Sequence, residues 1–365
     1  MSDATWRERA GDRPGLAPTE RGWGKLLLAL AAFLLVPSIP HLGAFAPVQQ
    51  TLLLFVPAMA ACSLVGWWAG GRFLPAAAWV ALAIVVTSQA AAGPGTFGLL
   101  ARGWTLLLAG SFGLVCLLGV ERPFFSRALV ALTIVLVVVV AMGAVGPVSA
   151  AQAKAAVAGE LARRNTAVLA KLQQAIAQSP DWKRLAAQAP ALEAMPEGLS
   201  QQLTTISASG AGLFLALLAI ESLCALALAW ATYHRFSRAR LGAPLAPLRH
   251  FRFNDQLVWG LIVGLTILFV PSLQGARPVG RNLVLFFGAL YMLRGLGVLT
   301  WFTSARALGA AAAVGVLLLL LGVLTLMPSL VALVVLAISL VSVLAMGLGL
   351  GDTWADWRSR ARPTT

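Results

Sequence analysis

Apolar residues fall in blocks of about twenty along most of the chain, the length that a helix needs to cross the hydrocarbon core of a bilayer. Ten blocks predict ten spans, at residues 25–39, 48–70, 73–91, 97–119, 126–148, 209–233, 256–275, 280–302, 305–326 and 329–350. The first block is the weakest, because Pro37 and Pro40 interrupt it. The pattern predicts an all-α fold, a polytopic transmembrane bundle of about ten spans.

A more polar segment, residues 150–207, separates the spans into two groups of five. Within it, Val157, Leu161 and Val168 recur at helical spacing, which predicts an amphipathic helix on the outer side. Such a helix could lie on the outer leaflet or pack as a connector, and the pattern favours neither. The predicted organisation is an N-terminal tail (1–24), a first membrane half (25–149), the outer segment (150–207), a second membrane half (208–350) and a basic C-terminal tail (351–365).

The charge of the chain supports a membrane topology and not a nucleic-acid partner. The chain is 59% hydrophobic and 11% charged, and its formal net charge of +14 lies between the apolar blocks instead of in one patch. Most basic residues fall in loops on the same side as the N-terminus, against Arg277 and Arg281 in the short loops opposite. The positive-inside rule therefore predicts that both termini are cytoplasmic.

No pattern of catalytic or metal-ligating residues stands out. The three histidines, His41, His234 and His250, are isolated at span ends or in loops. The three cysteines lie inside apolar blocks, where a free cysteine behaves as a small hydrophobe. We therefore expect no catalytic residue, no metal, no cofactor and no enzymatic activity.

Two ionisable residues lie deep within predicted spans, where a charge is costly and by default functional. Glu221 is near the middle of the sixth span, roughly 18 Å from the outer surface at 1.5 Å per residue. Arg294 is the one charge in "LYMLRGLGVLTWF" of the eighth span. We hypothesise that both face one cavity and bind a solute there; alternatively, Arg294 snorkels to the headgroups and Glu221 stays neutral, bonded to Ser222.

A basic elbow, residues 234–260, joins the sixth and seventh spans on the predicted inner side. Apolar side chains alternate there with basic ones, which suits the anionic surface of an inner leaflet. A cytosolic protein partner would suit the same surface. The predicted lipid or partner surface comprises Arg235, Arg238, Arg240, Arg249 and Arg252.

The second half, residues 205–360, resembles the YybS-like family of uncharacterised bacterial membrane proteins (domain of unknown function 2232). The resemblance rests on modest motifs: a Trp at a span entry, an Asn opening the next span, a Gly-Leu pair within it, and an Asp before an aromatic-Arg pair. These are Trp259, Asn282, Gly295 with Leu296, and Asp352 with Trp357 and Arg358. The resemblance implies a multi-pass protein of the bacterial cytoplasmic (inner) membrane.

Such proteins are more distantly similar to the substrate-binding components of energy-coupling-factor transporters, which implies a small-molecule pocket among the spans. The first span here lacks the Ala-x-x-x-Ala spacing by which those components dock their energising module. The expected function is therefore transport-related binding of a small solute, anionic solutes included, by Glu221 and Arg294. The second hypothesis is a non-transporting scaffold that binds lipid or protein partners through the basic elbow and the outer helix.

Overall fold

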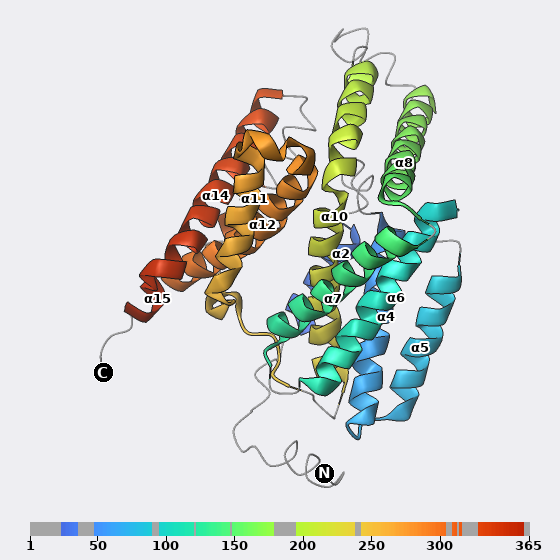
Figure 1. The fold of residues 1–365 in the computed structure, drawn as a ribbon, viewed down its shortest axis with the longest axis vertical. Coiled ribbons are helices and arrows are strands. Elements are labelled where there is room, and N and C mark those ends of the chain that lie inside the picture. Colours follow the sequence, from blue (N-terminus) through green and yellow to red (C-terminus); the bar gives the residue numbers. More distant parts are fainter. Residues whose placement is uncertain are drawn as a thin grey trace. The chain divides into compact units, whose positions relative to one another are not determined.

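The structure is a computed structural model in which every described element is helical. It describes residues 23–35, 47–89, 95–119, 122–146, 148–178, 195–237, 242–303, 309–311, 314–315 and 328–360. The α-helices are α2 (Trp23–Leu35), α4 (Val48–Trp68), α5 (Phe73–Ser88), α6 (Gly95–Leu118), α7 (Phe124–Val145), α8 (Ala150–Gln178), α10 (Met195–Phe236), α11 (Val258–Phe269), α12 (Arg277–Phe302), α14 (Pro328–Ala355) and α15 (Trp357–Arg360) (Figure 1). There are three short 3-10 helices: η4 (Leu248–His250), which packs against α12, and η5 (Asp255–Leu257) and η6 (Pro271–Ala276), which contact α11.

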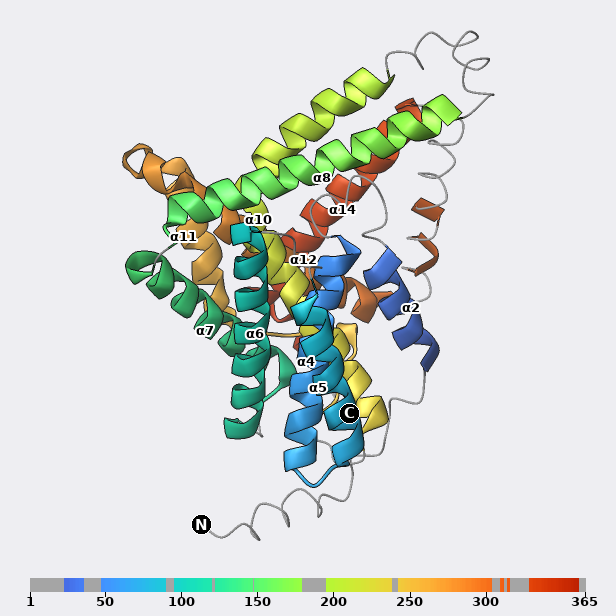
Figure 2. The same cartoon turned by 90° about the vertical axis from the view of Figure 1, so that its right-hand side faces the viewer.

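Two compact units make up the chain, unit 1 at residues 1–245 and unit 2 at 246–365. In unit 1, α4 packs against α5, α6 and α10 (Figure 2). Most of its side chains are buried. A helix that is apolar on all sides buries itself among others, so α4 is the centre of this unit. Its neighbour α6 in turn packs against α7 and α8.

In unit 2, α12 packs against α11 on one side and α14 on the other. A Cβ added at Gly295 would lie 1.7 Å from the carbonyl oxygen of Ala345, and one at Gly349 would lie 2.0 Å from that of Tyr291. Glycine at both positions is therefore what lets the backbones of α12 and α14 approach. The predicted motif glycine, Gly295, has this packing role.

The prediction of an all-helical membrane protein is confirmed at the coarse level. Six helices among the described residues are long and apolar enough to cross a membrane: Val48–Trp68, Gly95–Leu118, Phe124–Val145, Gly210–Phe236, Pro271–Phe302 and Leu336–Ala355. Three further predicted spans correspond to the shorter apolar helices Trp23–Leu35, Phe73–Ser88 and Asp255–Phe269. The span predicted at 305–326 lies largely outside the described residues.

The predicted amphipathic helix is present as α8, and Leu161 of its apolar stripe is buried. After residues 179–194, which the structure does not describe, α10 runs without a break from Met195 through the predicted sixth span. This helix packs against α4, α7 and α8. The predicted boundary between two halves, at 150–207, therefore differs from the boundary between the compact units, since the sixth span packs in unit 1.

Candidate functional site

Glu221 lies on α10 and reaches the first turn of α4. Its Oε2 accepts a hydrogen bond of 2.7 Å from Nε2 of Gln50, a buried amide. Its other oxygen, Oε1, is also buried and has no hydrogen-bond partner among the described residues. A buried polar atom without a partner costs free energy, so this oxygen is the feature of unit 1 that most needs a physical explanation.

Gln50 links Glu221 to α8. The Oε1 of Gln50 accepts a hydrogen bond of 3.3 Å from Arg164, and the Nε of Arg164 donates to Glu160 at 2.8 Å. Arg163 donates to both carboxylate oxygens of Glu160, at 2.7 and 2.8 Å. We call Glu221, Gln50, Arg164 and Glu160 the Glu221 chain; it connects a mid-span carboxylate to the amphipathic helix.

The charged side chains on α8 shift one another's pKa values. Burial raises the pKa of Glu160, but hydrogen bonds from Arg163 and Arg164 outweigh it and hold that pKa below its ordinary value. Burial lowers the pKa of the Arg164 guanidinium, and Glu160 opposes that shift. Arginine is effectively always protonated, so Glu160 and both arginines are charged at neutral pH.

One aromatic ring contacts the Glu221 chain, and a tryptophan bonds to the residue after Glu221. The guanidinium of Arg164 lies 5.0 Å from the ring centre of Phe97, within the range of a cation–π contact. Trp104 donates from Nε1 to the Ser222 hydroxyl at 3.0 Å, and that hydroxyl donates to the carbonyl of Leu218 at 2.7 Å. The alternative that Ser222 is the partner of Glu221 is therefore wrong, because the Ser222 hydroxyl accepts from Trp104 and donates to the Leu218 carbonyl of its own helix.

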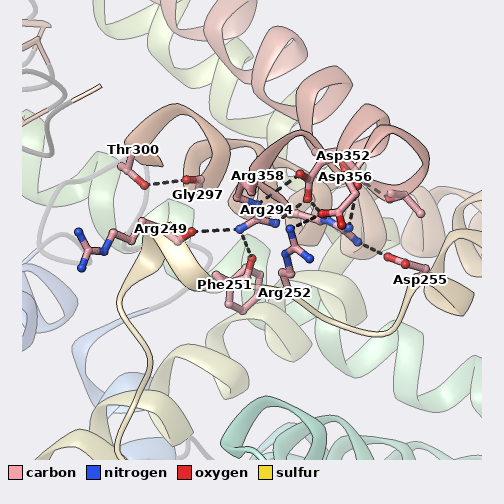
Figure 3. Close-up of polar contacts among 12 residues, drawn as sticks. Arg249, Phe251, Arg252, Asp255, Arg294, Gly297, Thr300, Asp352, Asp356 and Arg358 are labelled. Carbon is pink, nitrogen blue, oxygen red and sulfur yellow. Dashed lines mark hydrogen bonds and ion pairs between the residues drawn. The ribbon is translucent and has the colours of Figure 1, made fainter. Parts of the chain in front are cut away.

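Arg294 has its partners within unit 2 (Figure 3). Its NH1 donates to Asp255 at 2.6 Å, and its Nε donates to Oδ2 of Asp352 at 3.0 Å. Its guanidinium also lies over the ring of Phe253, at 5.4 Å. The side chain is 3% exposed, so the alternative that Arg294 snorkels to the headgroups is wrong.

Arg358 completes the Arg294 cluster, which we define as Arg294, Asp255, Asp352 and Arg358. Its NH2 donates to Oδ2 of Asp352 at 2.5 Å, and its NH1 donates to the carbonyls of Arg249 and Phe251 at 3.1 and 3.0 Å. Two arginines and two aspartates balance the formal charge. The cluster joins α12, the end of α14, α15 and the elbow backbone, as Figure 3 shows.

The family of the chain can be stated at this point. A family model described as "Predicted membrane protein (DUF2232)" matches residues 28–341. The chain belongs to this family. No curated protein and no solved structure matches the chain.

Some of the positions on which the family resemblance rests belong to the Arg294 cluster or lie next to it. Gly295 follows Arg294 and packs on α14, while Asp352 and Arg358, just beyond the matched residues, are members of the cluster. Asn282 donates to the carbonyl of Pro278 at 2.7 Å, inside its own helix. Trp259 is exposed. The motif thus coincides in part with the contacts that hold unit 2 together.

The predicted partner surface is only partly an exposed basic face. Arg249 is exposed, and its guanidinium points away from the cluster in Figure 3. Arg252 forms an exposed ion pair with Asp356, and Arg235 donates to the carbonyl of Ala231 at 3.0 Å. The remaining two, Arg238 and Arg240, lie outside the described residues.

Sequence reasoning missed three important polar residues. Gln50 and Arg164 were not singled out, although a glutamine pair opening an apolar block was a visible signal. The third is Asp255, which pairs with Arg294, whereas its neighbour Asn254 caps η5 by accepting from the Gln256 amide at 3.0 Å. No group of three or more His, Cys, Asp or Glu residues within the described ranges could hold a metal ion.

Arg127, at the start of α7, is also a buried cation. It is fully buried, with its guanidinium 5.2 Å from the ring centre of Trp230. A Cβ at Gly242 would lie 2.4 Å from NH2 of Arg127, and Gly242 has a φ of +78°. Both facts require glycine where the elbow passes over this arginine.

Proposed function

We propose that the protein is a multi-pass protein of the bacterial cytoplasmic membrane with about ten spans and both termini cytoplasmic. The membership of DUF2232 and the six long apolar helices support membrane insertion. The distribution of basic residues supports the orientation. Single-cysteine labelling of intact cells tests it: a cysteine at Ala186 should be labelled by an impermeant reagent and one at Ala243 should not, and equal labelling would overturn the topology.

Within the membrane, the proposed function is binding of a small solute by Glu221, in a transport-related role without a catalytic step. The observation that carries this proposal is the buried, unpartnered Oε1 of Glu221 in the middle of a candidate span. A carboxylate that had only to be stabilised would have both oxygens satisfied by the protein. An oxygen that is left over suits a ligand that supplies the missing hydrogen bond.

The geometry of Gln50 indicates the chemistry of the solute. Its amide donates to Glu221 and accepts from Arg164, so it lies between an acceptor and a cationic donor. A solute with an N–H or O–H donor at one end and an anionic or carbonyl acceptor at the other matches both neighbours. The contact with Arg164 is the longer of the two, at 3.3 Å, which makes it the easier one for a solute to replace.

Arg294 belongs to the other unit, and the hypothesis that it lines the same cavity as Glu221 stays a prediction. Its two aspartate partners favour a structural role over solute binding. The double charge reversal of Glu221 and Arg294 tests direct pairing. Recovery of the expression that each single reversal loses would support a shared cavity, and absence of recovery would contradict it.

A thermal-shift screen tests solute binding. The purified protein is heated with amino acids, vitamins, nucleobases and anionic metabolites, alongside Glu221→Gln and the control Asp356→Asn, which changes an exposed carboxylate in unit 2. The proposal expects at least one donor-bearing solute to stabilise the wild type and the control and to leave Glu221→Gln unshifted. Stabilisation of all three proteins alike would contradict a role for Glu221.

The alternative function is a membrane scaffold that uses the basic elbow. The observation favouring it is that Arg358 binds the carbonyls of Arg249 and Phe251, so the elbow backbone is fixed while the Arg249 side chain stays exposed. A fixed backbone with an outward arginine suits an anionic lipid surface or an acidic protein partner. Unchanged partner recovery with Arg249→Gln would count against this alternative.

A further inference from the structure

A small cavity lies between α4, α5 and the end of α10, away from the Glu221 chain. Its volume is about 40 Å³, and it is lined by Ser63, Trp67, Arg72, Trp79, Tyr233 and Ser237 among others. This volume admits one small polar group and not a whole lipid or metabolite. The lining combines aromatic walls with a cation, Arg72, and three hydroxyls, those of Ser63, Tyr233 and Ser237.

The backbone of the α4–α5 turn holds Arg72 at this cavity. Gly70 adopts a φ of +94°, and the amide of Gly71 donates to the carbonyl of Gly66 at 2.9 Å. A Cβ at Gly71 would lie 2.6 Å from that carbonyl oxygen, so the turn requires glycine there. Arg72 follows directly as the N-cap residue of α5, and α4 and α5 leave the turn side by side (Figure 2).

Arg72 is an available cation. Its side chain is exposed, and it has no hydrogen bond or ion pair with any residue that the structure describes. By contrast, Arg163, Arg252, Arg294 and Arg358 each have a carboxylate partner. An arginine left unpaired beside a cavity can offer its guanidinium to an anion in the bidentate geometry that phosphate prefers.

The surroundings of Arg72 resemble a membrane interface. Trp67, Trp68 and Phe73 are exposed at the ends of two apolar helices, and Trp67 packs edge-on against Phe73 at 5.4 Å. Exposed tryptophans at the end of a span mark the headgroup level of a bilayer. The Tyr233 ring closes the other wall, since a Cβ at Gly66 would lie 2.5 Å from it.

We propose that this cavity binds the phosphate group of one anionic phospholipid, with Arg72 as its cationic ligand and the Ser63 hydroxyl as a further donor. The acyl chains then lie along the exposed apolar residues of α5 and of the C-terminal end of α4. The described arginines of the predicted elbow surface, Arg235, Arg249 and Arg252, do not line this cavity. The site also does not depend on solute binding at Glu221.

Native mass spectrometry of the delipidated, full-length protein tests the proposal, with phosphatidylglycerol or phosphatidylcholine added in detergent. Arg72→Gln should reduce the bound phosphatidylglycerol about fivefold, the change expected from one basic contact at an anionic surface. Arg122→Gln is the matched control, an exposed arginine in the α6–α7 connection that does not line the cavity. It should leave phosphatidylglycerol binding unchanged.

Ser63→Leu separates a site from general attraction between charges, because it fills the cavity and leaves Arg72 in place. It should weaken phosphatidylglycerol binding as Arg72→Gln does, with an unchanged elution volume showing that the fold is kept. Three results would overturn the proposal: equal loss in Arg72→Gln and Arg122→Gln, full binding in Ser63→Leu, or equal retention of phosphatidylcholine by the wild type.

Discussion

Replacing Asp352 by asparagine removes the carboxylate that two buried arginines of unit 2 contact. Arg294 donates to Asp352 at 3.0 Å, and Arg358 donates to it at 2.5 and 3.3 Å. Both arginine side chains are only 3% exposed, so water cannot replace the lost charge. Removing one partner of a buried ion pair costs about 3–5 kcal/mol, and we expect Asp352→Asn to fall in that range.

Two other substitutions in unit 2 give comparison values for this loss of stability. Asp255→Asn removes an ion pair from Arg294, but the Asp255 side chain is 59% exposed and Asp352 remains, so about 1 kcal/mol is expected. Arg252→Gln breaks the pair with Asp356, whose members are 43% and 46% exposed, and should cost between about 0 and 1 kcal/mol. The three variants change similar chemistry and differ chiefly in burial.

Reversible unfolding of the purified protein in mixed detergent micelles, followed by tryptophan fluorescence, measures the three free energies of unfolding. The burial argument requires Asp352→Asn to lose at least about 2 kcal/mol more than Arg252→Gln. If the two variants are equally stable, the Arg294 cluster does not hold unit 2 together and the interpretation of Arg294 as structural is refuted.

Three other predictions concern α8, α12 and α6. The pKa of Glu160 is lowered in the folded protein, so its contribution to stability is complete above the ordinary glutamate pKa of about 4.3 and is lost as the pH falls through the lowered value. The free energy of unfolding should therefore be smaller at pH 3 than at pH 7. Glu160→Gln should abolish this difference. In the same unfolding assay, Gly295→Ala should destabilise the protein by about 1–3 kcal/mol through overpacking. Gly288→Ala is the control, because its Cβ would meet only the sulfur of Met346 at 3.5 Å, and it should cost less than about 1 kcal/mol. Trp104→Phe should cost about 1 kcal/mol by losing its bond to Ser222, and a double-mutant cycle with Ser222→Ala should recover that coupling; an additive cycle would contradict the bond.

The sequence located the buried charges better than their partners. Glu221 and Arg294 stand out because a charge inside an apolar block is costly wherever the chain folds. Their partners do not, since Gln50 is 171 positions from Glu221 and Asp352 is 58 positions from Arg294. Such pairs are created by helix packing, which no local pattern encodes.

The positions of the helices along the chain were predictable for a similar reason. Blocks of apolar residues determine where helices form, and α4, α6, α7 and α12 lie within a few residues of the predicted spans. The assignment of α10 to a unit was not predictable, because it depends on packing against α4. Small residues gave a partial signal, since Gly295 is where α12 and α14 meet.

The most direct test of the central claim is the affinity of the wild-type protein and of Glu221→Gln for one stabilising solute, measured by calorimetry in nanodiscs. Losing a hydrogen bond between a charged group and a solute costs about 1.5–3 kcal/mol, which corresponds to a loss of affinity of at least about tenfold. The account predicts this loss for Glu221→Gln and an unchanged affinity for Asp356→Asn. Equal affinity of the wild type and Glu221→Gln would contradict the assignment of Glu221 as the binding carboxylate.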